Sequence, residues 1–293
     1  MSFKEEIGSK IALNRPKLSK SSIKTYISIL TNIHKSMKSE VNNISWFSDN
    51  TKQIIEYLSD KQDSTKKTAL SALYVLTEKP DYRELMNTIM KKVNDAYKEQ
   101  KKDPKQEENW VSVDDIKTIY DGLLVKANSM LSNKSIMDSN IMMQFLLVAF
   151  LGGVSEIIPR RSLDYALLKI KNINTKTDNY YKSGKLYFNV YKTAKNYGLQ
   201  IVDLPANINT IIKKWIKINP TDYMLYSSNK QPLTSQSINR ILNSVFGKKV
   251  STDILRHVFI SNKYKDIPAL TQMETLSNAM GHNLITQLEY IKH

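Results

Sequence analysis

The C-terminal region of the chain places an arginine, a histidine and a tyrosine in an order that could carry out chemistry on a phosphate. Arg256 is followed by the pair Gly281-His282 and, eight positions after the histidine, by Tyr290. A guanidinium can pair with two phosphate oxygens, an imidazole can donate a hydrogen bond to one of them, and a phenol can attack the phosphorus. These residue types therefore favour transfer of a phosphodiester to a tyrosine without a metal ion.

The composition favours a polyanionic partner. The 293 residues include 43 Lys or Arg and 28 Asp or Glu, so the formal net charge is +15. A positive field of this size attracts nucleic acid. The chain has no cysteine, which excludes disulfides and thiol catalysis, and its four histidines do not share a metal-ligand spacing. We therefore expect nucleic acid as a partner and no metal ion.

The sequence shows neither a membrane-spanning segment nor a secretion signal. No apolar run approaches the roughly 20 residues that span a bilayer. The N-terminus lacks the apolar core of a signal peptide. We therefore expect no membrane association and an intracellular location, at DNA.

Residues 1–97 predict a helical domain. After N-cap candidates near Ser19, apolar residues recur at helical spacing, and three further amphipathic stretches follow. Residues 98–109 are polar, with one proline and no apolar anchor, which is typical of a linker. Residues 1–109 hold 20 basic and 15 acidic side chains, and residues 110–293 hold 23 and 13, so the second segment is the more cationic.

Residues 110–293 predict a second domain with mixed secondary structure. Residues 141–151 are apolar nearly all round and predict a buried helix. Two stretches, 185–191 and 199–204, predict paired strands joined by a turn over 192–198, and helical patterns return after residue 208. The predicted fold class is therefore mainly α with a small β-hairpin or sheet (α+β).

This order of features resembles the tyrosine recombinases, or phage-type integrases, over most of the chain. That family combines a helical core-binding domain, a linker and a mixed catalytic domain. Ile254-Leu255-Arg256-His257 resembles its second-arginine motif, and Met280-Gly281-His282 resembles its Gly-His motif. The resemblance implies that Arg256 and His282 bind the phosphate. It also implies that Tyr290 is the nucleophile, although many members place the tyrosine nine residues after the histidine. Tyr264 is the weaker candidate.

The family carries its general-acid lysine on a β-hairpin. Lys192 stands where the first predicted strand meets the turn, and this position implies that role for it. Lys195 lies three residues later and is the alternative.

Two registers are open for the first catalytic arginine of the family, whose pattern is Gly-Leu-Arg-x-x-Glu. One register puts Gly153 at the arginine position. The other puts Arg161 there, keeps an acid three residues later at Asp164, and leaves Arg160 as a phosphate contact or an alternate. We prefer the second, because the spacing to the following apolar segment fits. Its Pro-Arg-Arg-x-x-Asp-Tyr form resembles recombinases of large eukaryotic DNA viruses.

One residue departs from the family pattern. The family has a histidine three residues before the second arginine, and this chain has Asp253. A carboxylate beside a phosphate is unfavourable unless a cation offsets it. Asp253 could act as a general base, orient Arg256 or have no role.

The resemblance implies a site-specific recombinase that cuts and rejoins double-stranded DNA through a 3′-phosphotyrosyl intermediate, with no cofactor and no ATP. It implies a homotetramer on two DNA sites and a monomer or weak oligomer without DNA. Exposed lysines of the first domain are candidate DNA contacts: Lys20, Lys24, Lys66 and Lys67. Two alternatives remain, a catalytically inactive DNA-binding relative and a type IB topoisomerase-like enzyme; the helical first domain favours the recombinase over the latter.

Overall fold

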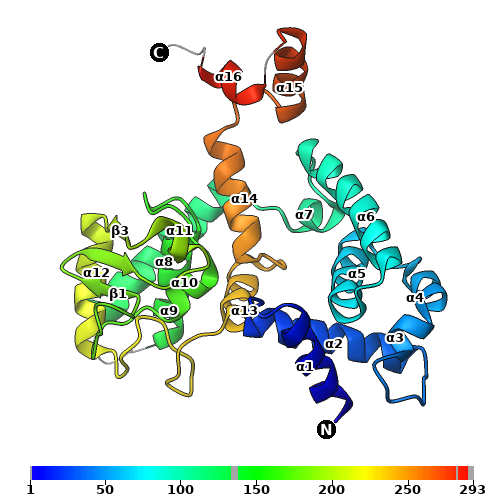
Figure 1. Ribbon diagram of the computed structural model, residues 1–293. Coiled ribbons are helices and arrows are strands. Elements are labelled where there is room, and N and C mark those ends of the chain that lie inside the picture. The colour runs from blue at the N-terminus through cyan, green and yellow to red at the C-terminus, as the bar shows by residue number, and fades with distance from the viewer. Residues whose placement is uncertain (1, 133–137, 282, 290–293) are drawn as a thin grey trace. The chain divides into compact units, whose positions relative to one another are not determined.

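The structure is a computed structural model that describes residues 2–132, 138–281 and 283–289. Its contacts divide the chain into two compact units, residues 1–101 with 268–293, and residues 102–267 (Figure 1). The sequence prediction instead grouped 268–293 with the second domain, and the predicted boundaries at residues 97 and 110 stay predictions. No helix in the described ranges is long and apolar enough to span a membrane.

The first unit is entirely helical in its described part. Capping residues set several helix ends: Ser2 and Glu5 form a reciprocal capping box at the start of the first helix, and Pro80 begins the sixth. The buried faces of the helices that precede residue 99 form one apolar core. The helices are α1 (Phe3–Asn14), α2 (Lys20–Ser36), α3 (Trp46–Asp49), α4 (Thr51–Leu58), α5 (Asp63–Thr77), α6 (Pro80–Lys98), α15 (Leu270–Ala279) and α16 (Leu284–Glu289).

Two polar contacts attach α15 to the end of α6. Lys98 Nζ lies 3.2 Å from Glu274 Oε1, and the Leu270 backbone N–H donates to Gln100 Oε1 at 2.7 Å. The second contact satisfies a free N–H at the start of α15, where the N-cap residue Ala269 has no side-chain acceptor. These contacts explain why residues 268–293 group with the first unit.

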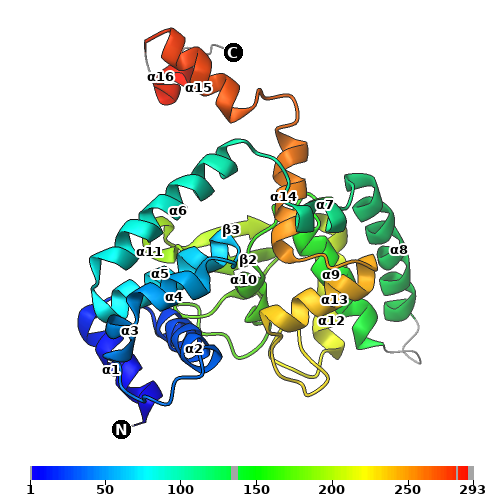
Figure 2. The same ribbon diagram turned by 90° about the vertical axis from the view of Figure 1, so that its right-hand side faces the viewer.

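The second unit surrounds α9 with other helices. Nine of its residues between Met142 and Leu151 are buried, as the all-round apolar pattern predicted. In Figure 2, α8, α9, α12 and α13 gather in one part of this unit, and each is in contact with another of them. The helices are α7 (Pro104–Asn109), α8 (Val113–Ser132), α9 (Ser139–Leu151), α10 (Ser162–Ala166), α11 (Ala194–Tyr197), α12 (Ala206–Ile218), α13 (Ser235–Phe246) and α14 (Thr252–Lys263).

The second unit also holds a small antiparallel sheet in the order β1-β2-β3, formed by β1 (Tyr180–Lys182), β2 (Lys185–Phe188) and β3 (Gln200–Asp203). The predicted pairing of β2 and β3 is confirmed, with Leu186 opposite Val202. The first strand was not predicted. The predicted strand over 185–191 ends early, because the backbone N–H of Val190 donates to the Asn179 side chain instead of continuing the ladder. The predicted mainly α fold with a small sheet is confirmed.

Two further differences concern segments expected to be irregular. The expected linker contains α7, which begins with a capping box between Asp103 and Gln106. The expected turn between the strands contains the short helix α11. Both helices are too short to produce a clear periodic pattern in the sequence.

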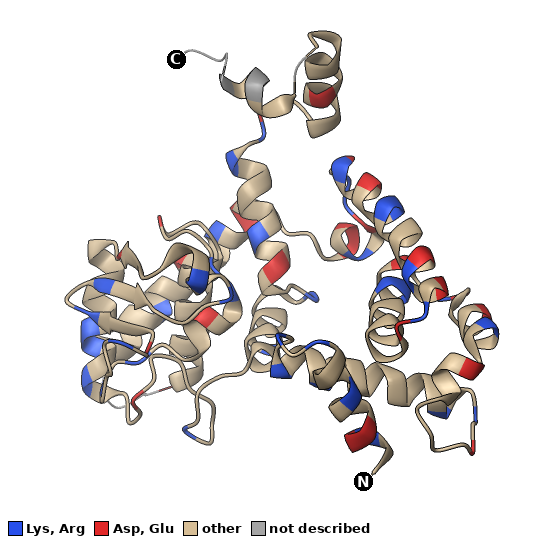
Figure 3. Cartoon of the chain, viewed as in Figure 1, with Lys and Arg blue, Asp and Glu red and all other residues tan. Residues whose placement is uncertain are grey.

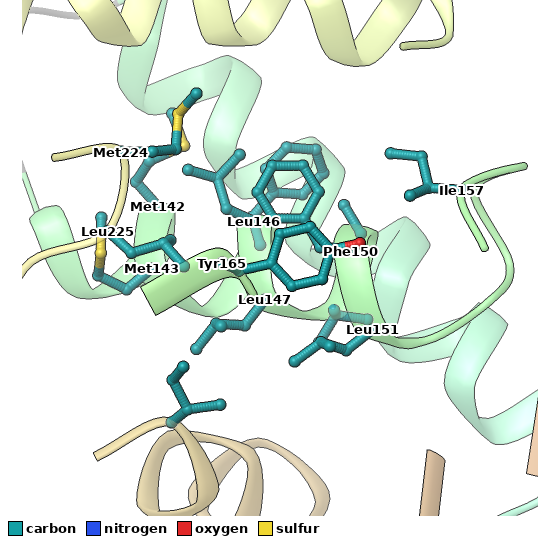
Figure 4. Packing of buried hydrophobic residues seen from close by; sticks show 14 of the residues in the cluster. Met142, Met143, Leu146, Leu147, Phe150, Leu151, Ile157, Tyr165, Met224 and Leu225 are labelled. Carbon is teal, nitrogen blue, oxygen red and sulfur yellow. The ribbon is translucent and has the colours of Figure 1, made fainter. Parts of the chain in front are cut away.

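Tyr165 fills the centre of the second core (Figure 4). Its ring stacks on Phe150 with 4.9 Å between ring centroids and meets Phe188 edge-on at 5.6 Å. The phenol is fully buried, and within the described residues its oxygen has no hydrogen-bond partner. Burial raises the pKa of this phenol, and the positive charge of Arg160 offsets the rise only in part. The hydroxyl therefore contributes an unfavourable desolvation to folding.

Tyr165→Phe is expected to raise the free energy of unfolding by up to about 1–2 kcal/mol, since it keeps both ring contacts and removes only the unpaired hydroxyl. Tyr82→Phe is the matched control. The buried Tyr82 hydroxyl donates to the Phe47 carbonyl at 2.7 Å, so its loss should lower stability by roughly 0.5–1.5 kcal/mol. Denaturant unfolding of both variants checks the difference in sign. Equal destabilisation by the two would mean that the Tyr165 hydroxyl does have a partner.

Candidate active site

The segment Pro159-Arg160-Arg161 leads directly into α10. Arg161 is the N-cap residue of this helix, and its carbonyl accepts the backbone N–H of Asp164 at 3.0 Å. Arg161 and Asp164 therefore lie on the same first turn. In the described part of the chain no hydrogen bond or ion pair occupies the Arg161 guanidinium, so its donors are available to a ligand.

Gly153 occupies a position where a side chain does not fit. Its φ of +70° is in the left-handed region, and a Cβ built there would lie 2.5 Å from Cδ2 of Phe259 on α14. An arginine at this position would clash with the ring of Phe259. The geometry therefore favours the register in which Arg161 takes the arginine position.

Asp164 is a buried acid that Arg160 contacts and on which two further arginines act through their charge. Its carboxylate is only 4% exposed and accepts a hydrogen bond from Arg160 Nε at 2.9 Å. Burial raises the pKa of Asp164, and the positive charges of Arg160, Arg161 and Arg256 act against this rise. Arg256 belongs to α14, so positive charges from the segment before α10 and from α14 both act on this carboxylate.

Arg160 differs from Arg161 because its guanidinium already has two hydrogen-bond partners. Besides the bond to Asp164, its Nη1 donates to Gln200 Oε1 on β3. Its guanidinium carbon lies 4.3 Å from the ring centroid of Phe188 and 4.8 Å from that of Tyr191. The side chain is 15% exposed. A phosphate would have to displace one of these partners to reach it.

Helix α14 places Arg256 beside Asp253. The Ser251 side chain caps the helix by accepting the Ile254 N–H, and the buried side chain of Leu255 fixes the rotation of the helix against the core. Arg256 Nη1 lies 3.2 Å from Asp253 Oδ1 one turn earlier. The Asp253 side chain is 80% exposed and that of Arg256 is 30% exposed. Of the three roles considered for Asp253, this contact favours orientation of Arg256.

The candidate lysines lie on the connector between β2 and β3. Lys192 precedes α11 and Lys195 lies on it, and both side chains are exposed. The Tyr191 hydroxyl donates to the Gly198 carbonyl at 2.7 Å and so closes the base of this connector. Within the described residues neither lysine has a salt-bridge partner, so both amines are available.

Two of the candidate residues, His282 and Tyr290, lie outside the described residues. The alternative nucleophile, Tyr264, is the C-cap residue of α14 and is 56% exposed.

The candidate DNA-contact lysines lie on two helices of the first unit. Lys20 and Lys24 are exposed on α2, whereas Lys66 and Lys67 on α5 are half-buried. Lys66 Nζ lies 3.7 Å from Asp63 Oδ1, so an acid already offsets part of its charge. Basic and acidic side chains also alternate along α6 (Figure 3). The charge of this unit is therefore mixed rather than uniformly positive.

The sequence named candidate arginines for this site but not the residues that hold them. It noted Asp164 only as an acid at the expected spacing, and it assigned no role to Phe188, Tyr191 or Gln200. The only sequence signal for Tyr191 is that it directly precedes Lys192. Contacts of Arg160 with residues 28 to 40 positions away leave no local pattern.

Solved structures of lambda integrase are similar to this chain. Lambda integrase bound to DNA aligns over 91% of this chain and 88% of its own, with a TM-score of 0.50 and 14% identity. A lambda integrase tetramer bound to a Holliday junction aligns over 91% of this chain and 74% of its own, with the same TM-score and identity. A XerA recombinase covers 97% of this chain and 91% of its own at 15% identity, with a TM-score of 0.36. No family model and no curated protein matches the sequence. The chain has the fold of lambda integrase.

Proposed function

We propose that the chain is a site-specific recombinase or integrase that cuts and rejoins DNA strands through a 3′-phosphotyrosyl intermediate. The observation that carries this proposal is that the positive charges of Arg161 and Arg256 both act on the buried carboxylate of Asp164, in a chain with the fold of lambda integrase. Guanidiniums present a planar set of donors that fits phosphate oxygens, so Arg161 and Arg256 are the residues proposed to hold the phosphodiester.

In the proposed cleavage step, the Tyr290 oxygen forms a bond to the scissile phosphorus, and the bond from phosphorus to the 5′ oxygen breaks. The phenol proton passes to solvent, and the leaving oxygen takes a proton from Lys192, with Lys195 as the alternative donor. Arg161, Arg256 and His282 stabilise the negative charge on the non-bridging oxygens. A 5′ hydroxyl then reverses the step and rejoins a strand. The phosphotyrosyl ester keeps the energy of the broken phosphodiester bond, so the proposed reaction consumes no ATP and uses no metal ion.

Asp253 is proposed to orient Arg256 rather than to contact the phosphate. The pair at 3.2 Å offsets the anionic charge that the carboxylate would otherwise bring to the site. Because the Asp253 side chain is largely exposed, the pair contributes little to stability. Its role is therefore confined to the direction in which the guanidinium points.

Double-stranded DNA is the proposed partner, and a homotetramer on two DNA sites is the proposed assembly. Both follow the lambda integrase structures, which hold DNA and, in one case, a tetramer on a Holliday junction. The net charge of +15 favours attraction to phosphates along the DNA, with Lys20 and Lys24 as exposed contacts. This attraction supplies affinity without sequence preference.

Covalent capture on nicked DNA tests the proposal. A pool of duplexes with a randomised centre and a nick beside it is incubated with the full chain. Cleavage near a nick releases a short strand, which diffuses away and leaves the protein attached to a 3′ phosphate. We expect a protein–DNA adduct that survives denaturing electrophoresis, forms in the presence of EDTA and disappears after protease treatment.

Other outcomes select among the alternatives. DNA binding without any adduct would replace the proposal with a catalytically inactive DNA-binding relative. Adduct formation together with relaxation of supercoiled plasmid, but without strand exchange between two sites, would indicate the topoisomerase-like enzyme instead.

A further inference from the structure

Arg160 joins the two elements that carry the candidate catalytic groups. On one side it is bonded to Asp164 of α10, through Nε at 2.9 Å. On the other side it contacts both strands that flank the connector, since its guanidinium lies over Phe188 of β2 and donates to Gln200 of β3. A single side chain therefore fixes the β2–β3 pair to the helix that follows Arg161.

The contact continues to the connector itself. The ring of Tyr191 lies 4.8 Å from the Arg160 guanidinium, and the hydroxyl of Tyr191 donates to the Gly198 carbonyl at the far end of the connector. Lys192 is the next residue after Tyr191. The backbone that carries Lys192 is therefore held by Arg160 through the ring of its neighbour.

Only an arginine can make this set of contacts. Its planar guanidinium can donate hydrogen bonds along two edges while its face lies over an aromatic ring. A lysine amine is a point charge that can keep one of the acidic or polar contacts but not all of them at once. The burial of Arg160 and the free guanidinium of Arg161 separate the roles of the two adjacent arginines.

We propose that Arg160 is a positioning residue that sets the Lys192 amine against the phosphate bound by Arg161, and does not itself bind the phosphate. This inference rests on the proposed function. A general acid must lie within about 3 Å of the oxygen that it protonates. A connector released from α10 would carry the lysine out of this range while the arginines keep their places.

The test compares two DNA substrates that differ in one atom. In the first, oxygen bridges phosphorus to the 5′ carbon of the leaving strand. In the second, sulfur takes that place, and a thiolate leaves without being protonated because thiols are far more acidic than alcohols. Loss of the general acid slows cleavage of the oxygen substrate alone, whereas loss of a phosphate-binding group slows both.

For Arg160→Lys we expect cleavage of the oxygen substrate to fall roughly 10- to 100-fold, part of the usual contribution of a general acid. Cleavage of the sulfur substrate should stay within about threefold of the wild-type rate. Arg240→Lys, an exposed arginine on α13, is the matched control and should cleave both substrates at the wild-type rate. An equal loss on both substrates would overturn the inference, because Arg160 would then bind the phosphate or support the whole site.

Tyr191→Phe provides a milder second variant in case Arg160→Lys does not fold. It keeps the ring against Arg160 and removes only the hydrogen bond to Gly198. We expect the same selective loss on the oxygen substrate, with a smaller magnitude. Wild-type rates on both substrates for Arg160→Lys and Tyr191→Phe would overturn the inference and leave the proposed function intact. If the wild-type chain cleaves neither substrate, the proposed function fails and the inference falls with it.

Discussion

Tyr290→Phe is expected to abolish the covalent protein–DNA adduct completely. Phenylalanine keeps the ring and removes only the oxygen that would bond to phosphorus, so no ester can form. Folding and DNA binding should be unchanged, because the cationic residues that hold the phosphate remain. Denaturing electrophoresis with a nicked duplex measures the adduct, and a mobility shift under native conditions measures binding. The variant should thus form a non-covalent complex only.

Tyr264→Phe is the matched control for this experiment. Tyr264 is 56% exposed at the end of α14, so its hydroxyl can be removed without loss of packing. It also precedes the Gly-His pair, whereas the nucleophile of the family follows that pair. We expect a wild-type amount of adduct. The reverse pattern, in which Tyr290→Phe forms the adduct and Tyr264→Phe does not, would move the nucleophile to Tyr264.

Arg161→Ala is expected to lower the rate of adduct formation by at least about 100-fold, the usual cost of removing one donor that stabilises a developing charge. The guanidinium has no hydrogen-bond partner within the described residues, so its removal breaks no hydrogen bond among them. Binding of intact DNA should therefore change little. Single-turnover cleavage on the oxygen and sulfur substrates measures the effect, and both rates should fall together.

The pair of adjacent arginines provides an internal control. Arg161→Ala should slow both substrates, whereas Arg160→Lys should slow only the oxygen substrate. Normal cleavage by Arg161→Ala would show that the Pro-Arg-Arg register is wrong. The arginine position would then fall on Gly153, where the ring of Phe259 leaves no room for a side chain, and the site would lack its first arginine.

Several parts of this molecule are determined by local sequence. The apolar pattern over residues 141–151 predicted the buried α9, and two strand-like stretches joined by a turn predicted the pairing of β2 with β3. These predictions succeed because a helix buried on all sides requires a continuous apolar run, and because a turn between two strands carries its own residue types. The spacing between Arg161 and Asp164 likewise placed both on one turn, which the start of α10 explains.

Other parts were decided only by tertiary structure. From the sequence, Arg160 and Arg161 are neighbours of the same type, and either could bind a phosphate. Their difference arises because Phe188, Tyr191 and Gln200 pack around one guanidinium and leave the other free. Similarly, the charge of Arg256 acts on Asp164, which lies 92 positions earlier in the sequence. Sequence spacing encodes which residues share a face of one element, but the contacts between elements depend on how their cores pack, and no local period carries that information.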